Sequence, residues 1–493
     1  MATEQDRPTA ESVPELQHFI DGEWVASESG ETRAATNPAT GEPIGRVPVG
    51  TRADARRAID AANDAQPDLE SMSAFERADL VAELGAAVAA NLDELAEWLT
   101  RDQGKPLAEA RGELELVVQM YEQAAAEIKH DETPSLNSAD PDKRMFTLRQ
   151  PHGVYGVITP WNFPGTIPTE YLAPGLAVGN AIVWIPAPTT SAVSVKLMAA
   201  FAESSLPAGA LNLVIGEGPV VGNEVVTSDD VDAIGFTGSP ETGDRIARDA
   251  GAKPTLLELG GNGPVIVMDD ADVEPAARIT AEGCFGNAGQ ICTASERILV
   301  HEAVADEFTD SLHEHAQAVT VGDPMADDTD MGPLNNDDVA AKMDRHVEDA
   351  RGKGATVLYG GARVQGAPTD LYYEPTVMDH VAPDTDVNRQ ETFGPIAPVI
   401  RFEDREEALS IANGIDLGLS SGVFTNDIDT MYYFAEGLET GLVNINEGSA
   451  YWEIHTPIGG FTGNNSGVGR IGGRFTLDEM SQLKNVIVDR KTG

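Results

Sequence analysis

The stretch VYGVIT (154–159) opens a series of short apolar runs that decides the fold class of this chain. Each run is rich in β-branched residues and closes on glycine, proline or aspartate, a pattern typical of buried strands. Helix-like segments, such as 191–204 and 241–250, lie between the runs. Repeated strand, helix, strand units predict a parallel sheet covered on both faces, an architecture that commonly binds nucleotides. The other runs are AIVWIPA (181–187), LNLVIG (211–216), AIGFTG (233–238) and PVIVMD (264–269).

Segments on either side of this series predict further layers. Upstream, an apolar stripe along 74–100 predicts a helix that packs on the sheet. Downstream, from about residue 297, a helix at 301–319 and a strand at 442–446 predict a second α/β domain. Two segments, 133–150 and 483–491, resemble exposed strands without a core of their own, and edge strands of this kind seek a partner.

Length and hydropathy limit the class of protein. A chain of 493 residues is too long for one compact core, so we expect two or three domains, and 41% hydrophobic residues can fill them. No apolar run approaches the roughly 20 residues of a membrane helix, and the first residues lack the pattern of a signal peptide. We therefore expect a cytoplasmic protein without a membrane partner.

Acidic residues dominate the charge of the chain. The 81 acidic residues exceed the 33 basic ones and give a formal charge of −48. Disorder is one interpretation, but the acids are spread through amphipathic segments, which indicates a solvated surface. Such a surface repels itself, and salt at about 1 M screens it over ~3 Å, as in a salt-loaded cytoplasm. It argues against nucleic acid as a partner, because phosphate binding requires basic patches.

The two cysteines cannot form a disulfide framework or a thiolate zinc site. Cys284 and Cys292 lie eight residues apart, which fits no common metal motif, so we expect no metal. A free cysteine is usually a small buried hydrophobe, and we interpret Cys284 in this way. Cys292 lies in the polar stretch GNAGQICTASER (286–297), where the alternative is a partly accessible nucleophilic thiolate of lowered pKa.

Seven short motifs in a fixed order decide between these alternatives. They are TPWNFP (159–164), FTGSPETG (236–243), LELGG (257–261), GQIC (289–292), ETFGP (391–395), PIGG (457–460) and SGVGR (466–470). With these motifs the chain resembles the aldehyde dehydrogenase superfamily over essentially its whole length, from FIDGEWV (19–25) to the C-terminal strand. The 34 residues that separate Glu258 from Cys292 also match the pattern of that family.

The resemblance implies both a fold and a reaction. The fold is α/β, with a Rossmann-like cofactor domain, a second α/β catalytic domain and a small β oligomerisation arm. The reaction is the NAD(P)-dependent oxidation of a small-molecule aldehyde to a carboxylic acid through a cysteine thiohemiacetal and thioester, in a homodimer or homotetramer. The implied cofactor domain comprises residues 1–127 and 151–260. The implied catalytic domain comprises residues 261–443 and extends to about 476. The implied arm comprises residues 128–150 and 477–493.

Three residues are candidate catalytic groups. By resemblance Cys292 is the nucleophile. Asn162 follows a strand end, where ligands meet parallel sheets, and its amide would form an oxyanion hole with the backbone N–H of Cys292; a turn residue is the alternative. Glu258 would activate water to hydrolyse the thioester, whereas an isolated glutamate is more often a solvated charge.

Cofactor and substrate roles follow from the same resemblance. Gly238 and Ser239 would receive the pyrophosphate at a helix N-terminus. Ile185 and Pro188 stand where most relatives hold the adenosine ribose with lysine and glutamate, so the choice between NAD and NADP stays open, with a lean to NAD. Candidate cofactor residues are Thr159, Pro160, Trp161, Ala187, Gly218, Phe236, Gly238, Ser239, Leu259, Gly260, Glu391 and Phe393. Candidate substrate residues are Phe163, Glu170, Tyr451, Trp452 and Ile458, with His455 as further lining or as a core histidine.

Some positions differ from the pattern of the family, and two alternative functions have to be considered. Ile471 stands where many members have a glutamate, which puts a second proton relay in doubt. Glu170 predicts that aldehydes with a nearby carboxylate are disfavoured. One rival is a relative that passes the thioester to CoA or phosphate, and the presence of Glu258 argues against it. Another is a structural scaffold without catalysis, which the intact Cys292, Asn162 and Glu258 oppose.

Overall fold

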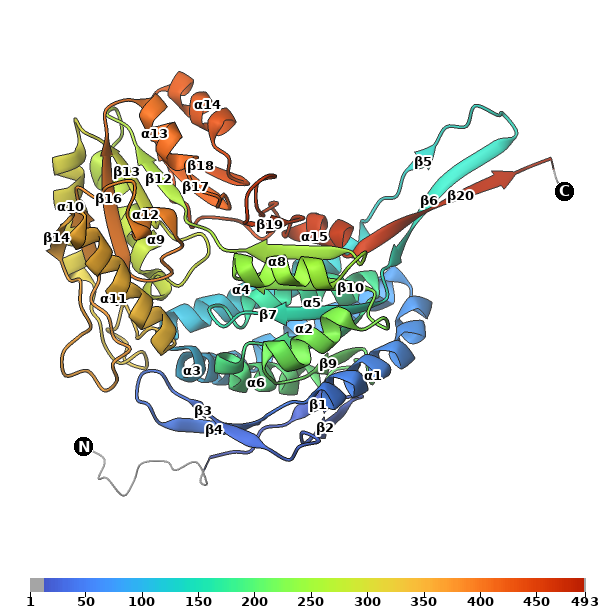
Figure 1. Cartoon of the computed structure of the whole chain (residues 1–493). Helices are drawn as coiled ribbons and strands as arrows, with labels where there is room; N and C mark the ends of the chain where they lie inside the picture. Colours follow the sequence, from blue (N-terminus) through green and yellow to red (C-terminus); the bar gives the residue numbers. More distant parts are fainter. Residues whose placement is uncertain (1–12, 492–493) are drawn as a thin grey trace.

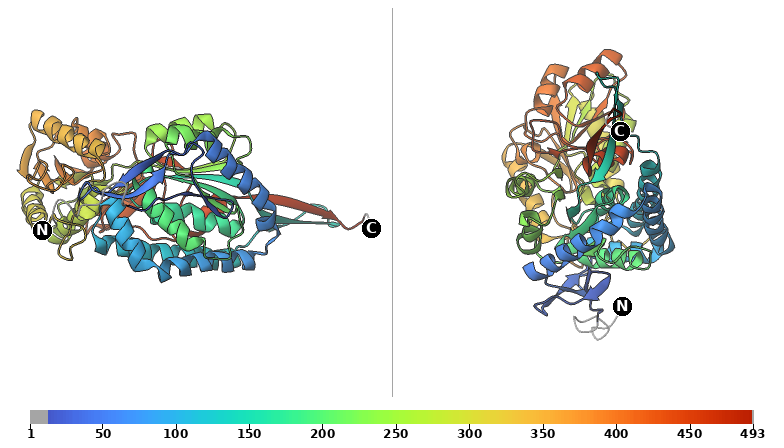
Figure 2. Two further views of the ribbon diagram at one scale, coloured as in Figure 1. Left: turned by 90° about the horizontal axis from the view of Figure 1, so that it is seen from below. Right: turned by 90° about the vertical axis from the view of Figure 1, so that its right-hand side faces the viewer.

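Two α/β bodies lie side by side in the computed structural model, and a thin β arm projects from one of them (Figure 1). The structure describes residues 13–491. Residues 1–12, on which the expectation about a signal peptide rests in part, lie outside the described residues. The view from below shows the arm extending well beyond the rest of the molecule (Figure 2). Within residues 13–491 no helix is long and apolar enough to cross a bilayer.

The first body is built on an eight-stranded sheet. Its strands are β1 (His18–Ile20), β2 (Glu23–Val25), β7 (Val154–Thr159), β8 (Ala181–Pro186), β9 (Leu211–Leu213), β10 (Ala233–Gly238), β11 (Thr255–Leu259) and β19 (Gly467–Val468). Their order is β19-β11-β10-β7-β8-β9-β1-β2. The strands from β11 to β9 run parallel, and β1, β2 and β19 are antiparallel additions at the two edges. The parallel sheet expected from the sequence is confirmed.

Helices cover both faces of this sheet. They are α1 (Arg52–Ser71), α2 (Ala74–Ala90), α3 (Leu92–Gln103), α4 (Leu107–Lys129), α5 (Thr166–Val178), α6 (Ser191–Phe201), α7 (Asn223–Thr227), α8 (Pro240–Asp249) and α15 (Gly473–Glu479). The apolar sides of α2, α4, α5 and α6 fill one buried cluster, and those of α1, α7 and α8 fill another. The sheet therefore separates two hydrophobic cores.

The segment 74–100 forms two helices instead of the single helix expected. Ser73 and Glu76 form a reciprocal capping box that starts α2, and Asn91 leaves helical geometry before α3 begins. Helix α2 packs chiefly on α4 and also contacts α5 and α6, which lie between it and the sheet. The apolar stripe therefore predicted burial correctly but named the wrong neighbour.

The second body contains a seven-stranded sheet. Its strands are β12 (Pro264–Val267), β13 (Arg297–His301), β14 (Thr356–Tyr359), β15 (Thr376–Asp379), β16 (Ile396–Phe402), β17 (Ser420–Phe424) and β18 (Leu442–Ile445). The strand order is β14-β15-β16-β13-β12-β17-β18. Its helices are α9 (Val273–Phe285), α10 (Ala305–Ala318), α11 (Asp337–Gly352), α12 (Asp386–Arg389), α13 (Arg405–Ala412) and α14 (Ile428–Gly437).

The division of strands between the sheets differs from the sequence expectation in two places. The run PVIVMD forms β12 in the second sheet, and β11, which was not among the expected strands, takes its place in the first. The chain returns to the first body after β18, because β19 pairs with β11 and α15 packs on α4 and α5. This return differs from the expected extension of the catalytic domain to about residue 476.

Two smaller sheets complete the described chain. The arm consists of β5 (Ser135–Leu136), β6 (Lys143–Pro151) and β20 (Ser481–Asp489). Strand β20 pairs with β6 along its whole length, from Ser481 opposite Pro151 to Asp489 opposite Lys143. A hairpin of β3 (Thr32–Thr36) and β4 (Pro43–Pro48) flanks the first body. The segments expected as exposed strands thus pair with each other despite their distance in sequence.

Candidate active site

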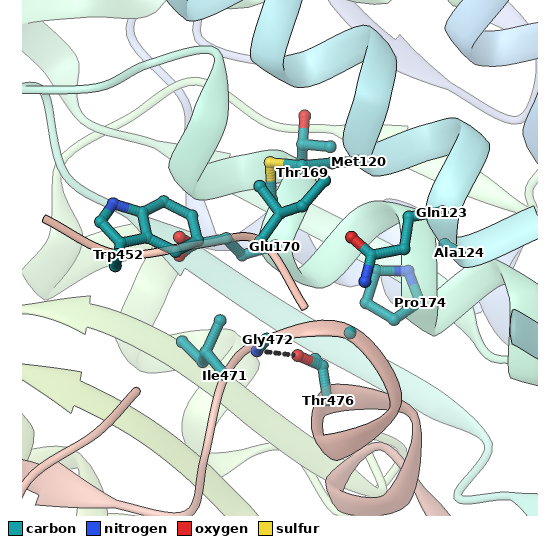
Figure 3. A pocket seen from close by; sticks show the side chains of 12 residues that line it. Met120, Gln123, Ala124, Thr169, Glu170, Pro174, Trp452, Ile471, Gly472 and Thr476 are labelled. Atoms are coloured by element: carbon teal, nitrogen blue, oxygen red, sulfur yellow. Dashed lines mark hydrogen bonds between the residues drawn. The ribbon is translucent and has the colours of Figure 1, made fainter. Parts of the chain in front are cut away.

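A cavity of about 340 Å³ lies between the first body and the loop that carries Cys292. This volume suits a small organic molecule. Six residues singled out from the sequence line it: Phe163, Glu170, Glu258, Cys292, Trp452 and Ile458. Figure 3 shows a smaller cavity, of about 30 Å³, in which Glu170 and Trp452 also take part, beside Ile471 and Thr476. Glu170 therefore lines both cavities.

A left-handed turn presents Cys292 to the cavity. Asn287, Ala288 and Gly289 have φ values of 47°, 53° and 72°, which only glycine adopts without strain. The buried Asn287 side chain holds the turn, because its Nδ2 donates to the Asn162 carbonyl at 3.0 Å and its Oδ1 accepts from Gln103 Nε2 at 3.0 Å. These contacts hold the Cys292 loop to the Asn162 loop.

The glycine pair after Glu258 allows the Cys292 loop to approach β11. A Cβ atom at Gly261 would lie 2.0 Å from the carbonyl oxygen of Cys292, closer than any side chain permits. A glycine at this position therefore brings the end of β11, with Glu258, next to the cysteine. The two catalytic candidates lie close together because Gly261 has no side chain to keep the Cys292 loop away from β11.

The Cys292 thiol is not the acidic thiol that the sequence led us to expect. Burial raises its pKa well above the ordinary value, and the carboxyl groups of Glu258, Glu170 and Glu391 raise it further. The expectation of a lowered pKa is therefore wrong for this state, because three segments place carboxyl groups next to the sulfur. Deprotonation of Cys292 requires a nearby proton acceptor.

Glu258 is placed to be that acceptor. Glu258 is 5% exposed and lies close enough to Cys292 for each group to shift the pKa of the other. Burial raises the pKa of Glu258 to about 8, the Cys292 hydrogen bond lowers it, and Glu391 raises it. Its Oε1 atom is buried and has no hydrogen-bond partner among the described residues. A buried acceptor without a partner is costly unless it serves a ligand or a reacting water.

Asn162 lies beneath the same loop, buried to 2% exposure. Its Nδ2 donates one hydrogen bond to the carbonyl oxygen of Gln290, at 3.0 Å. The amide has a second N–H, so it can donate to an oxygen on the carbon that Cys292 attacks. The structure therefore assigns Asn162 more than a turn-forming role.

The groove at the carboxyl ends of β7, β8, β10 and β11 fits a dinucleotide. Ser239 caps α8 by accepting from Thr242 N at 3.4 Å, so the N-terminus of this helix is available to a phosphate. A Cβ atom at Gly218 would meet nothing within 4 Å, which leaves the space beside it open. An adjoining slot of about 40 Å³ is lined by Ile158, Gly218, Gly222, Asn223, Val226, Thr242, Arg245, Ile246 and Asp249.

The second body closes this groove with Glu391 and Phe393. Glu391 accepts from the backbone N–H of Gly261 at 3.1 Å, and the Phe393 ring meets Trp161 edge-on at 5.4 Å. Phe393 has a φ of 57°, and Glu296 holds this strained turn by accepting from Phe393 N at 2.5 Å. Both candidates therefore lie where the two bodies meet.

Four other candidates have surroundings that define or change their roles. The Thr159 hydroxyl accepts from Trp184 Nε1 at 3.0 Å, so its side chain supports the sheet. Tyr451 is 49% exposed, donates to Glu453 and does not line the cavity. The His455 side chain is 59% exposed and pairs with Glu453 at 3.4 Å. The interpretation of His455 as a core histidine is wrong, because its side chain faces solvent. A role of Tyr451 or His455 in substrate binding stays a prediction. Cys284 is buried, as expected, and donates to Ser295 O.

Sequence reasoning missed one side of the cavity. Glu109, Glu113 and Leu116 of α4 line it together with Asn287. Their spacing places the three α4 residues on one face of the helix. Acids on the otherwise apolar face of a helix are unusual, and this pattern could have identified them.

Cys292 and Glu258 in one cavity beside a parallel α/β sheet are the arrangement expected of a cysteine-dependent oxidoreductase. The model of the aldehyde dehydrogenase family matches residues 24–486, and the chain belongs to this family. It is 37% identical to glutarate-semialdehyde dehydrogenase of Pseudomonas putida over 96% of this chain and 97% of the relative. It is 36% identical to the NADP+-dependent succinate-semialdehyde dehydrogenase of Escherichia coli over 96% and 97%.

A solved structure of an aldehyde dehydrogenase also resembles this chain in fold. Betaine aldehyde dehydrogenase of Staphylococcus aureus, in complex with NAD+, superposes with a TM-score of 0.93 at 32% identity, covering 97% of this chain and 96% of that one. The expected fold class is therefore confirmed. The protein is an NAD(P)-dependent aldehyde dehydrogenase that oxidises an aldehyde to a carboxylic acid.

Proposed function

We propose that Cys292, Glu258 and Asn162 carry out this oxidation by the hydrolytic route. The observation that supports it is that Cys292 and Glu258 line one cavity, where each group shifts the pKa of the other. Cys292 Sγ attacks the carbonyl carbon while its proton passes to Glu258. The developing oxyanion accepts from the Asn162 amide and the backbone N–H of Cys292.

Hydride removal and hydrolysis complete the reaction. NAD or NADP would supply the hydride acceptor when bound at this site. Loss of the hydride from the carbon attached to Cys292 leaves a thioester on the sulfur. Glu391, Phe393 and Trp161 would orient the nicotinamide end of the cofactor from the boundary of the two bodies. Glu258 first releases the Cys292 proton to solvent and can then take a proton from water. The resulting hydroxide attacks the thioester, the acid leaves, and the proton on Glu258 returns to the departing sulfur to restore the thiol of Cys292.

A product assay tests this route. The enzyme should convert an aldehyde and oxidised cofactor to the free acid and reduced cofactor without CoA or phosphate. Cys292→Ser should have no measurable dehydrogenase activity, because a serine hydroxyl is a far weaker nucleophile than a thiolate. Turnover that depends on added CoA or phosphate would place the chain in the acyl-transferring group instead.

We lean to NAD as the preferred cofactor. Ile185 and Pro188, at the end of β8, offer no cation to a 2′-phosphate. Glu217 precedes the open Gly218, and Arg33 Nη1 pairs with its carboxylate at 3.0 Å. A carboxylate beside the adenosine ribose favours hydroxyl groups over a phosphate. The ratio of kcat/KM for NAD and NADP tests this preference directly.

The arm, formed by β5, β6 and β20, supports the proposal of a homodimer or homotetramer. It exposes large apolar side chains on a thin sheet: Leu136, Phe146, Leu148, Leu483, Ile487 and Val488. Such a surface is a liability in a monomer and is suited to a second copy of the chain. We retain 1–127 and 151–260, 261–443, and 128–150 with 477–493 as proposed boundaries of the cofactor domain, the catalytic domain and the arm.

The charge of −48 supports a proposal about the cell compartment. We propose that the enzyme works in a reducing, salt-rich cytoplasm, where salt screens the repulsion between its surface acids. Cys284 and Cys292 are both unpaired, as a reducing compartment requires.

A further inference from the structure

Carboxyl groups surround the substrate space of this enzyme. Glu109, Glu113, Glu170 and Glu258 all line the cavity that holds Cys292. Among the described residues no lysine, arginine or histidine lines it. The buried Oε1 atom of Glu258, which has no partner, faces the same space. The cavity is thus a ligand site whose charged groups are all acidic.

One of these acids is already neutralised. Glu113 Oε2 pairs with Lys105 Nζ at 2.6 Å, and both side chains are at most 1% exposed. Glu113 Oε1 also accepts from the N–H groups of Gly165 and Thr166, at 2.7 and 3.1 Å, and so caps α5. The Lys105 ammonium lies behind the Phe163 ring, 3.7 Å from its centre. Lys105 therefore does not offer a free cation to a substrate.

Glu109 and Glu170 remain without a cation of their own. Glu109 accepts only from the backbone N–H of Asn287, at 3.0 and 3.2 Å. Glu170 accepts no hydrogen bond from any described residue. Burial raises the pKa of both carboxyl groups. The nearby Lys105, which is paired with Glu113, partly offsets this shift for Glu109, whereas Glu258 raises the pKa of Glu170 further. A cation in the cavity would stabilise both groups in their ionised form.

Aromatic rings add to this preference. Phe163 and Trp452 line the same cavity, and Figure 3 shows the Trp452 indole next to the Glu170 side chain. Lysine, arginine and ligand cations are attracted to the faces of such rings, most strongly where water is excluded. A positive group between Glu109, Glu170 and Trp452 would meet carboxylates and a ring face together.

We propose that the preferred substrates are aldehydes that carry a positive charge, as a primary amine or a quaternary ammonium group, close to the carbonyl. This inference rests on the proposed function of the same cavity. It separates the chain from the glutarate- and succinate-semialdehyde dehydrogenases that it resembles in sequence, since a glutarate or succinate semialdehyde carries a carboxylate. An anionic substrate would lie among Glu109, Glu170 and Glu258 without a counter-charge, at a cost of several-fold or more in kcat/KM.

The test compares aldehydes that differ in charge and little else. Trimethylammonioacetaldehyde and 3,3-dimethylbutanal have nearly the same shape, one cationic and one neutral, and succinic semialdehyde supplies the anion. All three aldehydes are compared at one fixed KCl concentration. We expect kcat/KM for the cationic aldehyde to exceed that for its neutral isostere by about tenfold or more, and to exceed that for the anionic aldehyde by a larger factor. A ratio of cation to isostere at or below one would overturn the proposal.

Variants test the residues themselves. Glu170→Gln and Glu109→Gln should each lower the ratio of cation to isostere by about tenfold, since each removes one carboxylate. Glu115→Gln, on the exposed side of α4, is the matched control and should leave the ratio unchanged. Unchanged ratios in both cavity variants would refute the assignment.

The same experiment distinguishes a failure of the substrate proposal from a failure of the proposed function. If the wild type oxidises the neutral or the anionic aldehyde well and the cationic one poorly, the substrate inference fails while the role of Cys292 stands. If it oxidises none of the three aldehydes with either cofactor, the proposed function is overturned and the inference with it.

Discussion

The raised pKa of Glu258 predicts a steep pH dependence for thioester hydrolysis. The base must be ionised to accept a proton from water, so its activity is lost as the pH falls through its pKa. With a pKa of about 8, roughly a tenth of the carboxyl is ionised at pH 7 and roughly nine-tenths at pH 9. Hydrolysis should therefore accelerate about tenfold over this interval and level off above it.

An activated ester isolates this step. An ester such as p-nitrophenyl acetate can acylate Cys292 without any hydride transfer, and the loss of the acyl group can then be followed by mass spectrometry at each pH. Glu258→Gln is the control, because its residual hydrolysis by hydroxide should keep rising by about tenfold per pH unit, without a plateau. A wild-type midpoint near 4.3, the ordinary value for glutamate, would refute the assignment of Glu258 as a buried base.

Three further predictions concern the loop, the arm and the surface. Gly261→Ala should lower kcat by about 100-fold, because the added Cβ would lie 2.0 Å from the Cys292 carbonyl oxygen and displace the nucleophile. Gly352→Ala is the control: its Cβ would meet nothing within 4 Å, so its kcat should match that of the wild type. A chain truncated after Leu483 loses most of β20, and its mass by light scattering should shift toward the monomer; an unchanged mass would place the interface elsewhere. The thermal midpoint and the activity should both rise from ~0.1 M to above ~1 M KCl, and equal values at both ends would contradict the role of the surface charge.

Local patterns predicted what depends on neighbours along the chain. The alternation of apolar runs and helical segments predicted the parallel sheet, because strand burial and helix amphipathicity are local properties. The motif spacing placed Cys292, Glu258 and Asn162 together. Which sheet receives a strand is decided by the chain crossing at Gly260 and Gly261, and a run such as PVIVMD has the same pattern in either sheet.

Properties that arise from several elements at once were not predictable in this way. The pKa of Cys292 depends on carboxyl groups from α5, β11 and the loop before β16, which are distant in sequence. The direction of Tyr451 and His455 depends on a turn that contains no periodic signal. Glu109 entered the site because α4 faces α5, a contact that only the packing reveals.

Trapping the acyl-enzyme tests the central claim most directly. Glu258→Gln, mixed with an aldehyde and oxidised cofactor, should release up to about one reduced nicotinamide per active site and then stall, because attack by Cys292 can proceed while water activation cannot. Without Glu258 the loss of the Cys292 proton should be slower, which slows this burst but does not remove it. Intact mass spectrometry should show the acyl group, and peptide mapping should place it on Cys292. Steady turnover of Glu258→Gln at the wild-type rate, with no acyl adduct on Cys292, would contradict the account.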